Sequence, residues 1–488
     1  MLAALSRNTI PLIVATALFM ANLDATVLST SLPAIARDLG LNPIHLKLAL
    51  TTYLLALAVF IPASGWAADK FGPKNVFRAA MAVFALGSIF CGLATGLGSL
   101  VGARVLQGIG GAMMMPVGRL IVWRSVPKSE IIAAAAWLTV PALLGPVLGP
   151  LLGGFISTYF NWRWIFWINV PVAAVGLLLI TRFIPDIRTT SPEGFDLKGF
   201  LLIGPGLSMF LTGVTLMGLG LVPPEVVIAL LAAGAVMMGA FVWHALRDPA
   251  PLLDLRLLKL PTFFAGVTGG FLFRTGIGAA PFLLPLLFQE GFGLTPFQSG
   301  ILIFATGFGA MFMKTQVAAI LRRWGYRNVL IVNALLSAVF SALPAAFTAL
   351  TPALLVSGIF FIGGLSRSLQ FTALNTISFA DVPEPKLSRA TSFASVVQEL
   401  SGAVGVTIAA LGLEAMMRLQ GTTAMTPSLF PPVFIAIALL SALSTAIYIW
   451  MLDKDAGSAL LVTPDMSRKG FAREAIAKES SDAEAGHL

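Results

Sequence analysis

The sequence contains about fourteen apolar stretches, each of the ~20 residues that a helix needs to cross a bilayer. Within lipid, backbone amides find partners only in a helix or a closed barrel, and the period-two alternation of barrel strands is missing here. We therefore predict an all-α polytopic membrane protein. The approximate centres of the stretches are Met20, Leu57, Leu86, Ile109, Leu144, Val172, Leu207, Ala235, Thr275, Gly307, Ser337, Ile362, Ala403 and Ala438.

The composition fits a lipid solvent and excludes several kinds of site. Of the 488 residues 57% are hydrophobic and 11% charged, whereas soluble chains carry about 25% charged residues. A single cysteine, Cys91, excludes a disulfide framework, and the three histidines are too scattered for a zinc site, so we expect neither metal nor cofactor. The first apolar run extends from Pro11 to about Pro33. It is longer than the ~7–15 residues of a signal-peptide core, so we expect a first span and no cleaved leader.

The basic residues are concentrated in alternate loops, and this asymmetry predicts the orientation. With the N-terminus inside, the cytoplasmic loops carry most of the Lys and Arg residues, as the positive-inside rule requires. We expect both termini in the cytoplasm, with a disordered polar tail after Asp453. The net charge of +9 then follows from topology, without a nucleic-acid partner. The opposite loops hold only Arg37, Lys47, Arg163 and Arg418. The cytoplasmic set is Lys70, Lys74, Arg78, Arg124, Lys128, Arg182, Arg188, Lys198, Arg247, Arg256, Lys259, Arg322, Arg323, Arg327, Lys386 and Arg389.

Two loops far apart in the chain resemble each other. When Gly72 in the loop after the second span is aligned with Gly325 after the tenth, the basic positions of the two loops coincide. This alignment pairs spans one to six with spans nine to fourteen, and transporters are commonly built from such halves. We predict an N-terminal six-helix bundle (1–184), two inserted spans with cytoplasmic linkers (185–260), a C-terminal six-helix bundle (261–453) and a cytoplasmic tail (454–488).

At the first of these loops the sequence resembles the major facilitator superfamily. Its motif is matched by Gly65, Asp69, Lys70, Gly72 and Lys74, while Pro73 departs from it at a usually basic position. The resemblance implies a cytoplasmic gate, to which we add Arg78. In it Asp69 accepts from helix N-terminal amides, and the cations pair with acids across the gap between the bundles. A solvated basic turn is the competing interpretation.

Further stretches resemble the fourteen-span drug:proton antiporters of this superfamily. They are Leu23–Pro33, Arg104–Gly111, Trp162–Pro171 and an antiporter motif in the fifth span. The resemblance implies two six-helix bundles with two extra central spans, and an antiporter that exports amphipathic or cationic drugs by alternating access. Small residues let helices approach closely and proline bends them, as a rocking seam between bundles requires. The residues of the antiporter motif are Gly145, Pro146, Gly149, Pro150, Gly153 and Gly154.

Ionisable residues inside spans cost about 3 kcal/mol or more, so each is a functional hypothesis. Asp24 is the leading proton carrier, because burial disfavours its anion and a cationic substrate would compete with the proton. A structural acid paired permanently with an arginine is the alternative. Glu399 is either a second proton site or a structural partner of Arg367 or another cation. Arg104 could snorkel to the surface, although its family position implies a role in shaping the proton site.

The resemblance places the substrate cavity on spans one, four, nine and twelve, which carry Asp24, Arg104, Arg274 and Arg367. Gln107 and Gln370 are candidates for hydrogen bonds to substrate, with helix packing as the alternative for both. Lys314 lies near the cytoplasmic end of its span, where it can snorkel to the surface.

Other functions are less well supported by the sequence. Export of one specific metabolite or lipid uses the same scaffold, whereas a non-transporting sensor or scaffold would not need charged residues on the cavity helices. An enzyme is not expected, because H-E-x-x-H, G-x-S-x-G and Walker motifs are absent. The predicted partners are the lipid bilayer, a small-molecule substrate and protons, in a bacterial inner membrane. The sequence does not decide whether a periplasmic adaptor protein is needed.

Overall fold

The computed structural model describes residues 9–126, 131–186 and 194–461, and within these residues the chain is helical, without β-strands. Thirteen of the described helices are long and apolar enough to cross a membrane. A further helix, α6 (Ile131–Tyr159), has 29 residues and includes a shorter apolar stretch, Leu143–Tyr159. The predicted all-α membrane fold is therefore confirmed, with a span count close to the one expected. Lys128, Arg188 and residues 462–488 of the predicted tail lie outside the described residues.

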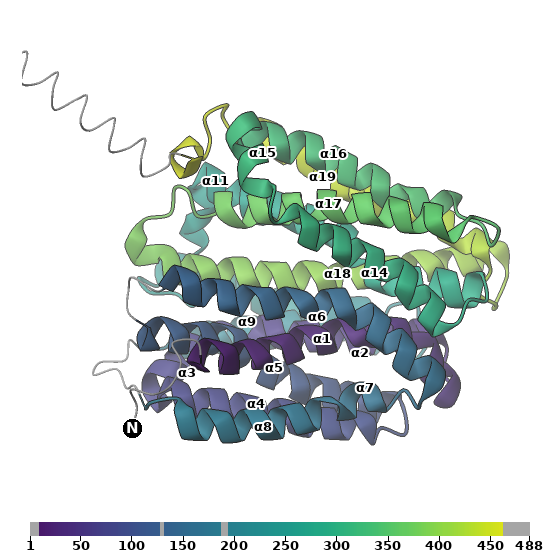
Figure 1. Ribbon diagram of the computed structural model, residues 1–488, viewed down its shortest axis with the longest axis horizontal. Coiled ribbons are helices and arrows are strands. Elements are labelled where there is room, and N and C mark those ends of the chain that lie inside the picture. The colour runs from purple at the N-terminus through teal and green to yellow at the C-terminus, as the bar shows by residue number, and fades with distance from the viewer. Residues whose placement is uncertain (1–8, 127–130, 187–193, 462–488) are drawn as a thin grey trace, which may run out of the picture.

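Helices α1 to α8 form a first bundle, which occupies the lower half of Figure 1. We call the end at which α1 begins the inner end and the opposite one the outer end; the inner end is on the left in Figure 1. The elements are α1 (Thr9–Asp38), η2 (Pro43–Leu46), α2 (Lys47–Phe60), α3 (Ala63–Phe71), α4 (Pro73–Gly92), α5 (Leu97–Ser125), α6, α7 (Trp164–Trp167) and α8 (Asn169–Phe183).

A second bundle occupies the upper half of Figure 1 and ends in the short helix η10. Its first span, Pro261–Gly291, is interrupted by two π-helical turns, η5 and η6. The elements are α11 (Pro261–Phe264), η5 (Ala265–Gly269), α12 (Gly270–Gly278), α13 (Ala280–Leu286), η6 (Leu287–Gly291), α14 (Pro296–Met313), α15 (Val317–Trp324), α16 (Tyr326–Ala342), η7 (Leu343–Ala346), α17 (Ala353–Ile377), η8 (Glu384–Lys386), α18 (Leu387–Gln420), η9 (Pro427–Leu429), α19 (Phe430–Met451) and η10 (Ser458–Leu461).

The two loops that resemble each other in sequence also have the same backbone geometry. Gly72 separates α3 from α4 with φ 85°, and Gly325 separates α15 from α16 with φ 72°. Positive φ is accessible to glycine at little cost, so a glycine between two helices allows the chain to turn sharply. The second turn therefore repeats the first at the inner end of the other bundle.

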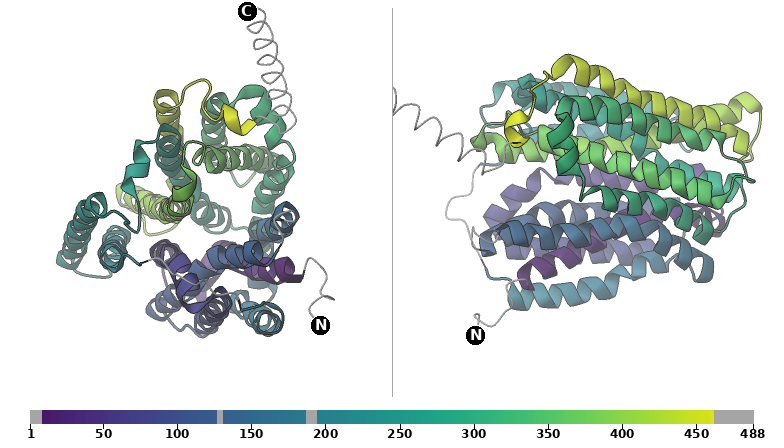
Figure 2. Two further views of the ribbon diagram at one scale, coloured as in Figure 1. Left: turned by 90° about the vertical axis from the view of Figure 1, so that its left-hand side faces the viewer. Right: turned by 45° about the horizontal axis from the view of Figure 1, so that its top comes forward.

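The two inserted spans, α9 (Leu197–Leu216) and α10 (Pro224–Arg247), lie beside the bundles, as the left view of Figure 2 shows. α9 contacts α2 of the first bundle and α18 of the second, where the hydroxyl groups of Thr215 and Thr407 are 3.2 Å apart. After α10, η4 (Leu255–Lys259) leads into the second bundle.

Asp196 fixes the inner end of this helix pair. Its carboxylate accepts hydrogen bonds from the amide of Gly199 at 2.7 Å and of Leu252 at 2.9 Å, and it lies 2.8 Å from His244 Nε2. Asp196, His244 and Asp248 are close enough to share a metal ion. However, Asp196 caps α9, so we regard this group as structural.

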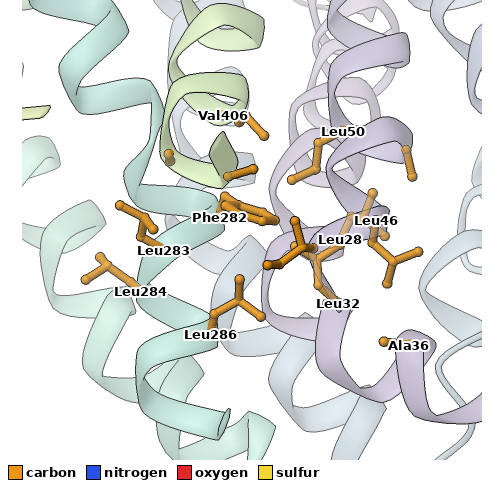
Figure 3. Close-up of a cluster of buried hydrophobic side chains, with 14 of the residues drawn as sticks. Leu28, Leu32, Ala36, Leu46, Leu50, Phe282, Leu283, Leu284, Leu286 and Val406 are labelled. Atoms are coloured by element: carbon orange, nitrogen blue, oxygen red, sulfur yellow. The ribbon is translucent and has the colours of Figure 1, made fainter. Parts of the chain in front are cut away.

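An apolar seam joins the two bundles towards their outer ends. In Figure 3, apolar side chains of α1 and α2, including Leu28 and Leu50, face Phe282 of α13 and Val406 of α18. Gln289 Nε2 donates to the carbonyl of Thr30 at 2.9 Å across the same seam. Figure 1 shows that α14 is inclined, so that it meets α6 at the outer end and lies further from it at the inner end.

A buried ion pair joins the bundles near the outer end. Lys47 Nζ at the start of α2 lies 2.9 Å from Glu414 Oε1 on α18, and the Lys47 side chain is completely buried. Lys47 is therefore not the exposed loop cation that the loop pattern predicted. Lys47 is the first residue of α2, directly after η2, and its side chain lies in the seam between the bundles.

Candidate functional site

Asp24 lies at the centre of a buried polar network in the first bundle. Its carboxylate on α1 is fully buried and accepts hydrogen bonds from Arg104 Nη1 at 2.6 Å and Gln107 Nε2 at 2.8 Å, both on α5. Asn169 Nδ2, at the start of α8, donates to the same carboxylate at 2.8 Å. Two helices, α5 and α8, therefore supply three donors to one acid on α1, which is the arrangement that stabilises an anion within a membrane.

Arg104 is held from several sides and does not reach the surface. Its Nε donates to the carbonyl of Ala49 at 3.2 Å, and its guanidinium lies 4.1 Å from the ring centroid of Tyr53 on α2. The buried atom Nη2 has no hydrogen-bond partner within the described part of the chain. The role implied by the family position of Arg104, beside the predicted proton site, thus fits its location, and snorkelling does not.

Sequence reasoning missed two members of this network. Asn169 appeared only as part of a motif, and Ser88 on α4 was not considered, yet Ser88 Oγ accepts from Gln107 Nε2 at 2.8 Å. Their signal in the sequence is a polar residue within an apolar span. Gln107 uses its amide inside the network, so in this conformation it is a packing residue and offers no free group to a substrate.

The second bundle carries two cations, one buried and one half-buried, around one aromatic ring. The guanidinium groups of Arg274 on α12 and Arg367 on α17 each lie 5.5 Å from the ring centroid of Phe371. Arg274 Nη2 donates to Asn375 Oδ1 at 2.7 Å. Arg274 follows the π-helical turn η5, and such turns are frequent at functional sites because they alter the direction of side chains.

Glu399 on α18 lies where the bundles face each other. It forms no ion pair among the described residues, so the predicted structural pair with Arg367 is not formed in this conformation. Electrostatic interactions connect it to Arg274 in its own bundle and to Tyr53 in the other. One turn further along α18, Gly402 contacts both Leu54 of α2 and Gly278 of α12. Glu399 is thus an acid near mid-membrane, between the two groups of charged residues.

Gln370 does not belong to the same surface as Arg367. Its side chain is fully buried, its Nε2 donates to the carbonyl of Leu330 at 3.1 Å, and its Oε1 accepts from Asn333 Nδ2 at 3.0 Å. Both ends of the amide are therefore used by α16. In this conformation the Gln370 side chain therefore serves the packing of α17 on α16.

The loop around Gly72 makes its contacts within the first bundle. Arg124 Nη2 at the end of α5 lies 2.9 Å from Asp69 Oδ1, and Lys74 Nζ donates to the carbonyl of Thr181 at 3.0 Å. Lys70 Nζ lies 4.7 Å from the Trp66 ring centroid, Gly65 on α3 has open space around it, and Arg78 is exposed. Among the described residues, no ion pair joins Lys70, Lys74 or Arg78 to an acid of the second bundle.

The antiporter motif makes α6 pack closely on α1 and on α14. A Cβ atom at Gly145 would lie 2.8 Å from the amide nitrogen of Leu23, and Gly149 and Gly153 are similarly close to α1. Gly154 instead meets α14, as does Pro150, whereas Pro146 is exposed. Most of the motif thus fixes a helix pair inside one bundle, and its outer part forms the seam with the other bundle. Three prolines lie within the helix, Pro141, Pro146 and Pro150.

Comparison with known proteins places this arrangement in a broad family. The sequence profile of the Major Facilitator Superfamily matches residues 14–406 and, in a second match, residues 266–473. Two relatives, from Salmonella newport (strain SL254) and Salmonella typhi, are each 39% identical over 441 residues, which is 89% of this chain and 93% of theirs. Both carry the provisional name multidrug resistance protein MdtD.

Solved structures with the same fold are far more distant in sequence. An auto-inhibited peptide transporter of the POT family has a TM-score of 0.68 at 16% identity, covering 91% of this chain and 97% of its own. A D-xylose–proton symporter has a TM-score of 0.66 at 14% identity, covering 92% and 98%. A bacterial homologue of the lysosomal transporter Spinster has a TM-score of 0.64 at 16% identity, covering 94% and 100%. At these identities the likeness establishes the fold alone.

Proposed function

The chain belongs to the Major Facilitator Superfamily, and from this premise we propose that it is a proton-coupled antiporter that exports amphipathic compounds from the cytoplasm. The relatives named as multidrug resistance proteins support export of drug-like molecules. We further propose a bacterial inner membrane with both termini in the cytoplasm, since the basic loops lie at the inner end. Residues 1–184 and 261–453 would then be the two moving bundles.

The observation that carries this proposal is the buried network around Asp24. A proton bound to Asp24 would remove the charge with which Arg104 pairs, so protonation and the position of Arg104 are linked. Arg104 in turn contacts Tyr53, which interacts electrostatically with Glu399 of the other bundle. We assign Asp24 as the proton carrier, Arg104 as a positioning cation and Glu399 as a second proton site.

Alternating access follows from where the bundles touch. Contacts between them, such as Lys47 with Glu414 and Gly154 with Pro296, close the outer end. In the proposed cycle this inward-facing form takes up substrate from the cytoplasm. The outer contacts must separate before the substrate is released outside, and a proton then loads from that side. The loop around Gly72 would act as the inner gate in the opposite conformation, when the inner ends approach each other.

The test is transport by the purified protein in proteoliposomes, using cationic, neutral and anionic dyes with and without an imposed pH gradient. We expect dye movement that depends on the gradient and is abolished by Asp24→Asn. The matched control is Asp38→Asn, which removes the charge of an acid at the outer end whose partner is Arg163. Transport that does not need the gradient would contradict proton antiport. Full coupling in Asp24→Asn would instead favour a permanently paired, structural Asp24.

A further inference from the structure

Arg274 and Arg367 are two cations in the membrane interior with almost no compensating charge. Both contact Phe371, so the two guanidinium groups are no further apart than twice their 5.5 Å distance to its ring centroid. Arg274 is 5% exposed, and its buried Nε has no hydrogen-bond partner among the residues that the structure describes. Neither arginine forms an ion pair within the described ranges 9–126, 131–186 and 194–461. Such charges are costly in a membrane, so a pair of them is a candidate binding site.

The charge balance leaves one cation unpaired. In the first bundle Asp24 and Arg104 neutralise each other. In the second bundle Glu399 interacts electrostatically with Arg274, and among the described residues no carboxylate is paired with Arg367. One acid therefore faces two arginines, and a singly charged anion would make the site neutral.

The surroundings of Arg367 are suited to a ligand with an apolar body. Arg367 lines a cavity of about 70 Å³ in the second bundle, together with Thr306 and Ser337 and several apolar side chains, among them Phe360 and Phe434. This volume exceeds the 10–15 Å³ that one water needs. It is well below the ~300–1,000 Å³ of a drug-sized pocket. The cavity can therefore admit one part of a substrate, and the rest would lie between the bundles.

We infer that Arg274 and Arg367 bind the anionic head group, a carboxylate or similar oxyanion, of the transported amphiphile. An arginine presents a planar fork of donors that matches a carboxylate with two parallel hydrogen bonds. Phe371 holds both guanidinium planes by cation–aromatic contact, and so limits their rotation before a ligand arrives. This inference rests on the proposed function, because it defines the chemical class of the exported compound. It selects anionic amphiphiles, where the sequence predicted amphipathic or cationic drugs.

The test is equilibrium binding without any gradient, so its failure is distinct from a failure of transport. Two probes share a pyrene ring and a four-carbon chain: 1-pyrenebutyrate is an anion and (1-pyrenebutyl)trimethylammonium is a cation. Binding to the detergent-purified full chain is followed by energy transfer from its nine tryptophans to pyrene. We expect saturable binding of the anion and weaker binding of the cation. Arg274→Gln and Arg367→Gln should each weaken anion binding at least ~10-fold, which corresponds to about 1.4 kcal/mol.

Controls separate loss of the site from loss of the fold. Arg322→Gln removes an equal charge from the exposed helix α15 and should leave binding unchanged. Every variant is checked by size-exclusion chromatography and thermal unfolding. If Arg274→Gln fails to fold, Arg274→Lys and Arg367→Gln test the inference in its place. Lysine keeps the charge but loses the planar fork of donors, so Arg274→Lys should bind the anion with intermediate affinity. Tighter binding of the cationic probe, or an unchanged anion affinity in the folded glutamine variants, would overturn the inference.

A second arm identifies the source of the anion. The same titration is made in nanodiscs of phosphatidylcholine alone and of phosphatidylcholine with phosphatidylglycerol. If a lipid head group occupies the arginines, phosphatidylglycerol will compete with 1-pyrenebutyrate, and the competition will disappear in Arg367→Gln. If the site is reserved for soluble amphiphiles, the two lipid compositions will give the same affinity. Both results support an anion site, and they distinguish its two ligands.

Discussion

The ion pair between Lys47 and Glu414 should control how often the outer end opens. It links α2 to α18 across the seam between the bundles, with Lys47 Nζ 2.9 Å from Glu414 Oε1. The pair can exist only while the outer end is closed. Glu414→Gln or Lys47→Met should therefore shift the equilibrium towards the outward-facing form.

The magnitude follows from the burial of the pair. The Lys47 side chain is fully buried and that of Glu414 is 12% exposed, so water screens the interaction little. A hydrogen bond to a charged group contributes about 1.5–3 kcal/mol, and each 1.4 kcal/mol is a factor of ten. While the outward-facing form is a minor species, its population should thus rise by about 10- to 150-fold. An unpaired Lys47 acts in the same direction, because opening allows water to solvate it.

Cysteine accessibility provides the assay. The chain has a single cysteine, Cys91, which is buried and can be replaced by alanine. Leu286 lies in the apolar seam of Figure 3 and is fully buried, so Leu286→Cys reports opening of the outer end. A membrane-impermeant maleimide added outside should label this cysteine faster in Glu414→Gln by the same factor as the population changes.

The control is an ion pair at the same end that does not join the bundles. Arg163 Nη1 lies 2.6 Å from Asp38 Oδ2 within the first bundle, so Arg163→Gln should leave the labelling rate unchanged. Exchanging the charges, with Lys47→Glu and Glu414→Lys together, should restore slow labelling. The reasoning is refuted if Glu414→Gln labels at the original rate, or if Arg163→Gln accelerates labelling as much.

Three further predictions concern stability, measured as Tm of the purified protein. Gly149→Ala should lower Tm, because a Cβ atom there overlaps Thr26 and overpacking costs about 1–3 kcal/mol. The control is Gly239→Ala on α10, which has open space around it and should not lower Tm. Gly325→Ala should cost about 1–2 kcal/mol through its positive φ alone, and an unchanged Tm would contradict the turn geometry. Burial alone would raise the pKa of Asp196. Hydrogen bonds from Gly199, Leu252 and His244 to the carboxylate have the larger combined effect, so the pKa lies below its ordinary value of 3.8. Asp196→Asn should therefore be less stable than the unaltered protein at pH 7, and the difference should shrink as the pH falls below 3.8.

Features set by local sequence could be predicted. Apolar length is enough to locate a span, and a glycine between two helices at a basic loop is enough to predict the turns at Gly72 and Gly325. The charged residues inside spans, such as Asp24 and Glu399, were also found, because their cost in lipid makes them conspicuous in any apolar segment.

Features that depend on distant residues could not be predicted. Lys47 follows a loop, so the charge pattern counted it as a surface cation, and its partner Glu414 lies 367 residues further along the chain. Arg367 and Gln370 are three residues apart on one helix, yet one lines a cavity and the other bonds to α16. The rotation of α17 about its axis decides between these roles, and apolar composition does not specify that rotation.

The position of α9 and α10 makes the two sides of the protein unequal towards the bilayer. The seam between α2 and α18 is covered by α9, which contacts both helices, whereas the seam between α6 and α14 has no inserted span beside it (Figure 2). A hydrophobic compound dissolved in the inner leaflet would thus meet the two inserted helices on one side and the helices of the bundles themselves on the other. The inserted pair would then restrict sideways entry from the lipid to the α6–α14 side.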